Sequence, residues 1–210
     1  MENKIYVVGI GPGHRDYITP AAMNALSKSD VIIGSKRHID GLDFLKSEFF
    51  EMASPFKETI EFIKNNLNNK KIAIVVSGDP GFYSFLNLLK KDFASDELSV
   101  IPGISSMQYF FSKLSMDWKD ASLISLHGRD LDIVEMMKKS KKLFLLTDKI
   151  NSYREIASVL IENNMADLDM YIGSDLSYEN EKIYCLKASE ALNLELKSDL
   201  IVVIIYNEEN

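Results

Sequence analysis

The chain has 210 residues, 46% of them hydrophobic, and a formal net charge of −7. That length allows one ordinary domain or two small ones with sizeable cores, which excludes collagen and disordered chains, and the negative charge disfavours a nucleic-acid partner. No apolar run approaches the ~18 residues that span a bilayer, and the start lacks a signal peptide. One cysteine and three histidines favour neither a disulfide nor a metal centre. We therefore expect a cytoplasmic, metal-free protein without a membrane partner.

Short continuous apolar runs, rich in β-branched residues, predict strands that are buried on both faces. They lie at 5–8, 31–33, 72–76, 143–146 and 200–205. Between them, an N-cap and proline pair at Thr19-Pro20 and a capping-box spacing at Ser152 and Glu155 each predict a helix. Further helices are expected over 35–47, 56–69, 82–93, 104–116 and 129–140. The alternation of strands and helices predicts an α/β fold.

A polar stretch at 116–120 separates two such series, and the charge balance changes near it. Residues 1–115 hold 13 basic and 13 acidic side chains, whereas residues 116–210 hold 11 and 18. We therefore expect two domains, 1–117 and 118–210. Strands at 168–173, 181–185 and 199–206 follow one another with little helix between them, which predicts a mixed second sheet.

Three loops concentrate glycine and proline, and each directly follows a predicted strand. They read Gly9-Ile10-Gly11-Pro12-Gly13-His14, Ser77-Gly78-Asp79-Pro80-Gly81 and Ile101-Pro102-Gly103-Ile104-Ser105-Ser106. Ligands of open α/β sheets bind outside the carboxyl ends of the strands, where glycine permits close backbone approach. Tight strand-to-helix turns would explain any one of these loops, but the three together favour a ligand site.

Two nucleotide-binding patterns are not met. His14 stands where the dinucleotide fingerprint requires glycine or alanine, and the second strand ends in Gly34-Ser35 without an acidic residue. The phosphate-binding pattern that ends in Gly-Lys-Ser/Thr is missing. A nicotinamide enzyme and a nucleoside triphosphatase are therefore disfavoured.

Polar side chains in the second and third loops have two interpretations each. Asp79 could accept hydrogen bonds from a ligand's ammonium or hydroxyl groups, or it could cap a helix. Ser105 and Ser106 present hydroxyls at a helix start, where they too could serve a ligand or act as caps.

In order and spacing, the three loops resemble those of the tetrapyrrole (corrin and porphyrin) methylases, and the resemblance extends over essentially the whole chain. It implies two α/β domains with the active site in the cleft between them, and S-adenosylmethionine as cofactor. The stretches Gly34-Ser35-Lys36-Arg37-His38 and Ser125-Leu126-His127-Gly128-Arg129-Asp130 resemble the branch that methylates carbon 5 of precorrin-7 or cobalt-precorrin-7 in cobalamin biosynthesis.

The resemblance also implies site residues. The expected cofactor contacts are Ile10, Gly78, Asp79, Phe82, Ser105, Ser106, His127 and Thr147. The expected substrate contacts are Gly11, Pro12, Gly13, Lys36, Arg37 and Arg129. Because the substrate is an anionic tetrapyrrole and the protein is negative, binding needs a local basic cluster, to which Arg15 and His38 are further candidates.

The sulfonium of the cofactor already activates the methyl group, so the protein's expected task is to align two reactants and exclude water. No catalytic residue is assigned; His127 is the candidate for assisting proton movement, with His14 as the other possibility.

The resemblance leaves alternatives open: methylation of another ring carbon, diphthine synthesis, ribosomal RNA methylation, or a non-catalytic S-adenosylmethionine-binding module. Family resemblance also implies a homodimer. Some relatives carry a second domain for carbon 15 methylation and decarboxylation; since the chain stops at Asn210, we expect a separate protein to perform that step.

Overall fold

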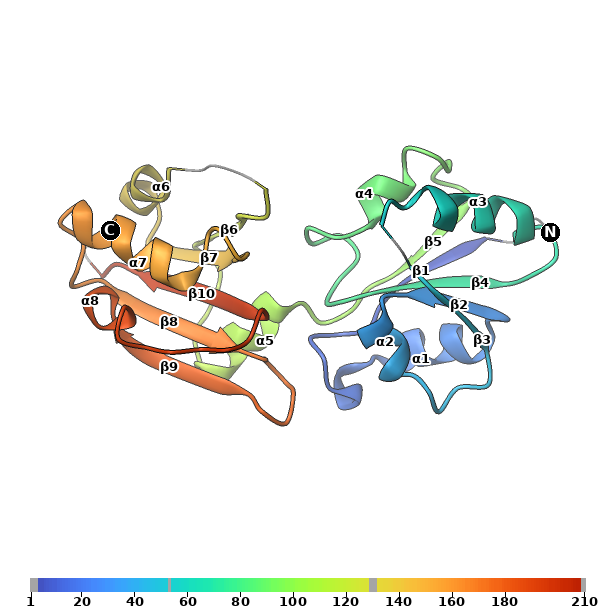
Figure 1. Ribbon diagram of the computed structural model, residues 1–210, viewed down its shortest axis with the longest axis horizontal. Coiled ribbons are helices and arrows are strands. Elements are labelled where there is room, and N and C mark those ends of the chain that lie inside the picture. Colours follow the sequence, from blue (N-terminus) through green and yellow to red (C-terminus); the bar gives the residue numbers. More distant parts are fainter. Residues whose placement is uncertain (1–3, 53, 129–131, 209–210) are drawn as a thin grey trace. The chain divides into compact units, whose positions relative to one another are not determined.

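The computed structural model describes residues 4–52, 54–128 and 132–208. It divides into two compact units, one up to Ser105 and one from Ser106, and each unit is described by itself. Each contains one five-stranded sheet with helices packed against it (Figure 1). The α/β class predicted from the sequence is therefore confirmed for both units.

The first unit is a parallel sheet. Its strands are β1 (Ile5–Gly9), β2 (Val31–Gly34), β3 (Glu48–Glu51), β4 (Ile72–Val76) and β5 (Leu98–Ile101). They lie in the order β3-β2-β4-β1-β5, and every neighbouring pair is parallel. All five strands therefore end at one edge of the sheet, and the connections that follow β1, β4 and β5 there are the three glycine loops.

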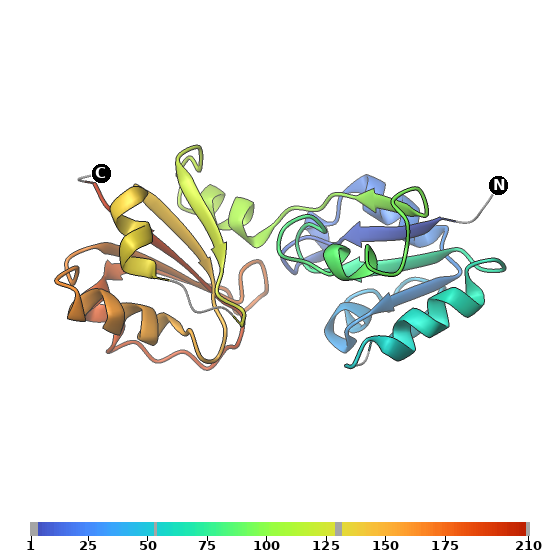
Figure 2. The same ribbon diagram turned by 90° about the horizontal axis from the view of Figure 1, so that it is seen from above.

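Helices cover both faces of this sheet, which explains why its strands are continuously apolar (Figures 1 and 2). The helices are η1 (Arg15–Tyr17), α1 (Pro20–Ser27), α2 (Lys36–Asp40), α3 (Lys57–Asn66) and α4 (Leu86–Leu89). On one face α3 and α4 bury residues such as Ile63 and Leu89 against Val7 and Ile74. On the other face α1 buries Leu26 against Val75. As predicted, Thr19 caps α1, its Oγ1 accepting a hydrogen bond from Ala22 N at 3.1 Å.

Two predicted helices are shorter than expected. Helix α2 ends at Asp40 instead of 47, because Gly41 follows and the chain turns into β3, a strand that the sequence analysis missed. Strand β3 reads Glu-Phe-Phe-Glu and has no β-branched residue that would indicate a strand. The helix expected over 82–93 keeps only Leu86–Leu89, since Tyr83 has a φ of 47°, a left-handed conformation that a right-handed helix cannot include.

The second unit has the predicted mixed sheet. Its strands are β6 (Ala121–Ser125), β7 (Lys142–Leu146), β8 (Asp169–Ser174), β9 (Lys182–Lys187) and β10 (Ile201–Tyr206). In the order β6-β7-β10-β8-β9, only the first pair is parallel. Because β8 and β7 both run opposite to β10, strands β6, β7 and β8 end at the same edge of this sheet.

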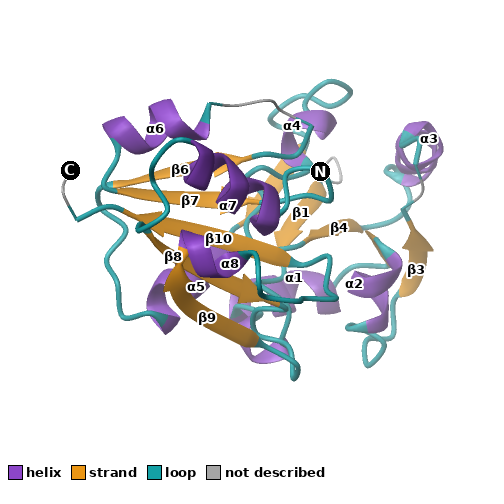
Figure 3. Ribbon diagram, turned by 60° about the vertical axis from the view of Figure 1, so that its left-hand side comes forward, coloured by secondary structure: helices purple, strands orange, loops and turns teal. Residues whose placement is uncertain are grey.

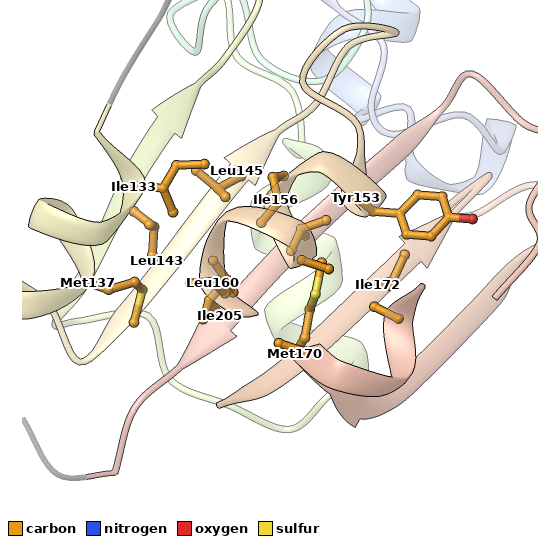
Figure 4. Close-up of a cluster of buried hydrophobic side chains, with 14 of the residues drawn as sticks. Ile133, Met137, Leu143, Leu145, Tyr153, Ile156, Leu160, Met170, Ile172 and Ile205 are labelled. Atoms are coloured by element: carbon orange, nitrogen blue, oxygen red, sulfur yellow. The ribbon is translucent and has the colours of Figure 1, made fainter. Parts of the chain in front are cut away.

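Three helices cover one face of the second sheet, and a fourth packs on the other face (Figure 3). They are α6 (Ile133–Lys139), α7 (Tyr153–Glu162) and α8 (Ala188–Ala191), against α5 (Ser106–Lys113). Figure 4 shows the core on the first face, where Ile156 and Leu160 of α7 lie over Leu143 and Leu145. Ser152 caps α7 as predicted, since its Oγ accepts a hydrogen bond from Glu155 N at 3.3 Å. Part of the helix expected over 129–140 falls on 129–131, outside the described residues.

Contacts of α5 and of the segment after it determine where the second unit begins. The ring of Phe111 lies 6.3 Å from that of Phe144 in β7. Lys142 Nζ donates a hydrogen bond to the carbonyl oxygen of Asp117 at 2.7 Å and pairs with its carboxylate at 2.9 Å. The second unit therefore begins at Ser106, ahead of the boundary expected at 117, because a helix that looked like the end of the first series belongs to the second sheet.

Backbone contact between glycines holds the three loops of the first unit together. A Cβ placed on Gly9 would lie 2.5 Å from the carbonyl oxygen of Gly78 and 2.7 Å from the nitrogen of Gly103. A Cβ on Gly103 would lie 2.2 Å from the same oxygen. Side chains do not approach backbone so closely, so Gly9 and Gly103 require glycine and the loops converge as predicted. None of the helices in the described part of the chain combines the length and the hydrophobicity that a membrane-spanning segment needs.

Gly103→Ala is expected to destabilise the protein by about 1–3 kcal/mol, the usual cost of forcing an extra methyl into a packed site. Gly41→Ala is the matched control, since the nearest atoms to a Cβ there are at 3.6 and 3.7 Å. Both variants are unfolded in urea, and the urea concentrations at the midpoint of the first unit's unfolding transition are compared. Equal midpoints for the two variants would contradict the interlocked arrangement.

Candidate functional site

The first loop pairs directly with the second. Gly78 N donates to the carbonyl oxygen of Gly11 at 2.8 Å, and Gly11 N donates back to Gly78 O at 3.3 Å. Both glycines adopt positive φ, 83° and 65°, which β-carbon sterics disfavour for other residues. The single N–H of Gly78 is used in this pair, so the contribution of Gly78 that the structure shows is to hold the loops together.

Asp79 joins the second loop to the third. Its Oδ1 accepts a hydrogen bond from Gly81 N at 2.8 Å, and its Oδ2 accepts one from Gly103 N at 3.1 Å. The capping interpretation does not hold, because α4 begins only at Leu86. A carboxylate offers about four lone-pair sites, so Asp79 retains acceptor capacity toward a ligand while it connects the loops.

The other first-unit residues expected at the cofactor lie at or beside this edge. Ile10 is 9% exposed and Ser105 3% exposed. Phe82 is half-buried, with its ring 5.1 Å from that of Tyr83, and it precedes α4 instead of lying on that helix. Ser106 is the first residue of α5 and therefore part of the second unit.

In the second unit, His127 and Thr147 follow the ends of the neighbouring strands β6 and β7. His127 Nδ1 lies 3.2 Å from Ser125 Oγ, and the His127 ring is exposed. Thr147 is 6% exposed, and its hydroxyl donates to the carbonyl oxygen of Ile201 at 2.7 Å. Its oxygen lone pairs stay available to a donor. A cavity of about 260 Å³ lies here, lined by Thr147, Asp148, Lys149, Ser152, Tyr153, Arg154, Leu196, Ser198, Asp199 and Ile201.

Asp148 organises this second edge, and the sequence analysis missed it. Its carboxylate accepts hydrogen bonds from the backbone N–H groups of Asn151 at 2.6 Å, Ile150 at 2.9 Å and Gly128 at 3.3 Å. These bonds, the one from Asn151 foremost, outweigh the opposing effect of burial and lower the pKa of Asp148. The sequence contained a signal for this role, because Asp148 follows a strand end just as Asp79 does. Asp148 therefore ties the loop after β6 to the loop after β7.

The structure describes four residues of the expected basic cluster, namely Arg15, Lys36, Arg37 and His38. Lys36 pairs with Asp40 at 3.5 Å, and Arg37 Nη2 lies 3.5 Å from His38 Nε2. Burial, together with the charge of Arg37, lowers the pKa of His38 to about 4, so His38 is neutral at pH 7 and adds no positive charge. Arg15 lies over the Phe44 ring at 5.9 Å. Arg129 falls outside the described residues.

Each unit by itself offers an acceptor of the kind that suits an ammonium or hydroxyl group of a ligand, Asp79 in the first unit and Thr147 in the second. In the second unit, a Cβ placed on Gly128 would meet nothing within 4 Å. A larger hollow of about 440 Å³ along α3 includes none of the expected site residues. Among the described residues, no three His, Cys, Asp or Glu side chains gather as metal ligands.

Comparisons with known proteins agree with the geometry. The family model of the tetrapyrrole (corrin/porphyrin) methylases matches residues 4–192. A probable cobalt-precorrin-7 C(5)-methyltransferase of Methanocaldococcus jannaschii is 34% identical over 98% of this chain and 99% of its own length. The cobalt-precorrin-7 C(5)-methyltransferase of Salmonella typhimurium is 33% identical over 94% of this chain and 97% of its own.

One solved structure extends the likeness to the fold. The uroporphyrin-III C-methyl transferase of Thermus thermophilus, complexed with S-adenosylhomocysteine, has a TM-score of 0.77 at 17% identity, covering 96% of this chain and 97% of that one. With the family model matching nearly the whole chain and two relatives above 30% identity at almost full length, the chain belongs to the tetrapyrrole (corrin/porphyrin) methylases.

Proposed function

We propose that this protein transfers a methyl group from S-adenosylmethionine to carbon 5 of cobalt-precorrin-7, or of the cobalt-free precorrin-7, in cobalamin biosynthesis. The observation that carries the proposal is the match, over almost the full chain, to two relatives named for that reaction. The strand-end loops support it, because they present acceptors for a ligand at the place where open α/β sheets bind one.

When bound, the cofactor supplies a methyl group already activated by a sulfonium leaving group. The ring carbon of the substrate provides the electron pair for the new carbon–carbon bond, and the sulfur keeps the pair of the bond that breaks. The positive charge passes to the macrocycle, which then loses a proton. His127 is the candidate for assisting that loss, since its ring is exposed and its Nδ1 lies 3.2 Å from Ser125 Oγ.

The protein's contribution in this scheme is alignment. Ile10, Gly78, Asp79, Phe82, Ser105 and Ser106, with His127 and Thr147, are the proposed cofactor contacts. The rigidity that alignment requires is supported by the Gly11–Gly78 pairing and by the two backbone hydrogen bonds that Asp79 accepts. Fixed loops reduce the entropy lost when two reactants are brought to attack distance.

Gly11, Pro12, Gly13, Lys36, Arg37 and Arg129 are the proposed substrate contacts. Exposed guanidinium and ammonium groups suit the carboxylate side arms of a tetrapyrrole, and Arg37 is exposed beside a neutral His38. The homodimer, the cytoplasmic location and a separate protein for carbon 15 stay predictions.

The proposed activity is tested by incubating the purified protein with S-adenosylmethionine and a panel of precorrins and cobalt-precorrins. Mass spectrometry should show a single added methyl group, and NMR with a ¹³C-labelled methyl donor should place it at carbon 5. Methylation at another ring carbon would replace the proposed regiochemistry. Cofactor binding without methylation of any panel member would favour a non-catalytic binding module.

Asp79→Ala is expected to weaken S-adenosylhomocysteine binding by about 1–3 kcal/mol, because it removes a charged acceptor that also connects two loops. Isothermal titration calorimetry measures the affinity, and Asp92→Ala serves as the control in the same unit, where the carboxylate pairs at 2.7 Å with Lys64. An unchanged affinity for the Asp79 variant would confine Asp79 to holding the loops.

Arg37→Ala and Arg129→Ala are each expected to lower kcat/KM for the tetrapyrrole about tenfold, equal to about 1.4 kcal/mol of lost charge-assisted hydrogen bonding. Cofactor affinity should change little, because both residues are assigned to the substrate. Steady-state methylation assays and calorimetry with S-adenosylhomocysteine separate the two effects. Equal losses in both measurements would show that the division between substrate and cofactor residues is wrong.

A further inference from the structure

Glu181 is the centre of a polar cluster that no part of the proposed reaction uses. It lies in the connection between β8 and β9, and its side chain is 18% exposed. Its Oε2 accepts hydrogen bonds from Tyr109 Oη and from Ser177 N, both at 2.6 Å, while its Oε1 lies 3.0 Å from Lys113 Nζ. One carboxylate thus connects a helix and a loop that lie far apart in the sequence.

The hydrogen bonds favour the ionised carboxylate. Burial acts to raise the pKa of Glu181, but the bonds from Tyr109, Ser177 and Lys113 outweigh it and lower the pKa below its ordinary value. Glu181 is therefore charged at neutral pH. Charge-assisted bonds of this kind are shorter and stronger than neutral ones, so the cluster holds its members firmly.

The loop that Glu181 holds is conformationally strained. Asp175 has a φ of 50° and Ser177 a φ of 70°, and both occupy the left-handed region that residues with a Cβ rarely adopt. Asp175 is fixed in turn by Ser174 Oγ at 2.8 Å and Ser198 Oγ at 2.6 Å. Strained residues of this kind persist only where surrounding contacts over-determine them, and they gather at functional sites.

The helix that Glu181 holds is α5, which begins at Ser106. Tyr109 and Lys113 are four residues apart, so they lie on one face of the helix. Both contact Glu181, and Lys113 Nζ lies 5.6 Å from the centre of the Tyr109 ring. Two contacts one turn apart on a single partner fix both the rotation and the axial position of the helix.

We propose that Glu181 is a positioning residue for the cofactor site: by fixing α5, it directs Ser106 toward the cofactor. This inference rests on the proposed function, in which Ser106 is a cofactor contact. Glu181 acts through α5 and touches no reacting atom. The end of β8, where its loop begins, lies at the same edge of the second sheet as the ends of β6 and β7, after which His127 and Thr147 follow.

The test compares three variants in the full-length protein. Glu181→Ala removes every contact, and Tyr109→Phe removes one hydroxyl while keeping the buried ring. Glu135→Ala is the matched control, since Glu135 forms an exposed ion pair with Lys139 in the same unit. Calorimetry with S-adenosylhomocysteine, thermal unfolding, and KM values for both substrates are measured for each variant.

We expect the dissociation constant for S-adenosylhomocysteine to rise about tenfold in Glu181→Ala and about threefold in Tyr109→Phe, as expected for the loss of several and of one hydrogen bond. The KM for S-adenosylmethionine should rise with it, the KM for the tetrapyrrole should stay within about twofold, and Glu135→Ala should match the unaltered protein.

A purely structural role would lower the unfolding temperature of Glu181→Ala and leave both KM values unchanged, and that outcome would overturn the proposal. If Glu181→Ala does not fold, the test depends on Tyr109→Phe alone. An unchanged cofactor affinity of Tyr109→Phe would then overturn the proposal. Failure of the unaltered protein to bind S-adenosylhomocysteine would instead refute the proposed function, so the two failures are distinguishable.

Discussion

Direct backbone contact among Gly9, Gly78 and Gly103 is the constraint on which the first unit's site depends. These residues lie at or just after the ends of three adjacent strands. Neither Gly9 nor Gly103 has room for a Cβ, and Gly78 adopts a positive φ of 65°. Because the strands are parallel, their loops meet at one edge, and only glycine lets the loops touch without intervening side chains. Asp79 then joins the second and third loops through two backbone N–H groups. The loop surface is consequently rigid and carries a partly buried carboxylate.

In the second unit, the loops at the sheet edge are held together by carboxylates. There, a carboxylate at a strand end replaces the glycine contacts: Asp148 accepts three backbone N–H groups and ties the loops after β6 and β7 together. Glu181 does the same for the helix α5 and the strained loop after β8. Ionised acceptors suit this task, since one carboxylate can accept several charge-assisted hydrogen bonds from donors on different segments. Both units therefore use acidic residues at strand ends to hold loops in place.

Loops that are held in place suit a reaction in which the cofactor and the substrate themselves supply the reactive groups. A sulfonium-activated methyl group needs no nucleophile from the protein, and the methyl acceptor supplies its own electrons. What raises the rate is the reduction of freedom in both reactants, and rigid loops accomplish this before the substrates arrive. Because His38 is neutral, Arg37 and Lys36 are the exposed cations of the segment after β2.

The α/β class, the caps at Thr19 and Ser152, most strands and the convergence of the three loops could all be predicted from the sequence, because continuous β-branched runs and glycine placement are local signals. The other features depend on contacts that form only in the folded chain. Strand β3 forms because an open edge of β2 pairs with it, although its Glu-Phe-Phe-Glu sequence contains no β-branched residue. Helix α5 and the segment after it belong to the second unit because Phe111 and Asp117 contact Phe144 and Lys142 of β7. Asp148 depends on the backbone N–H of Gly128, and Glu181 on the side chains of Tyr109 and Lys113. These partners are distant in the sequence, and only folding brings them within hydrogen-bonding distance.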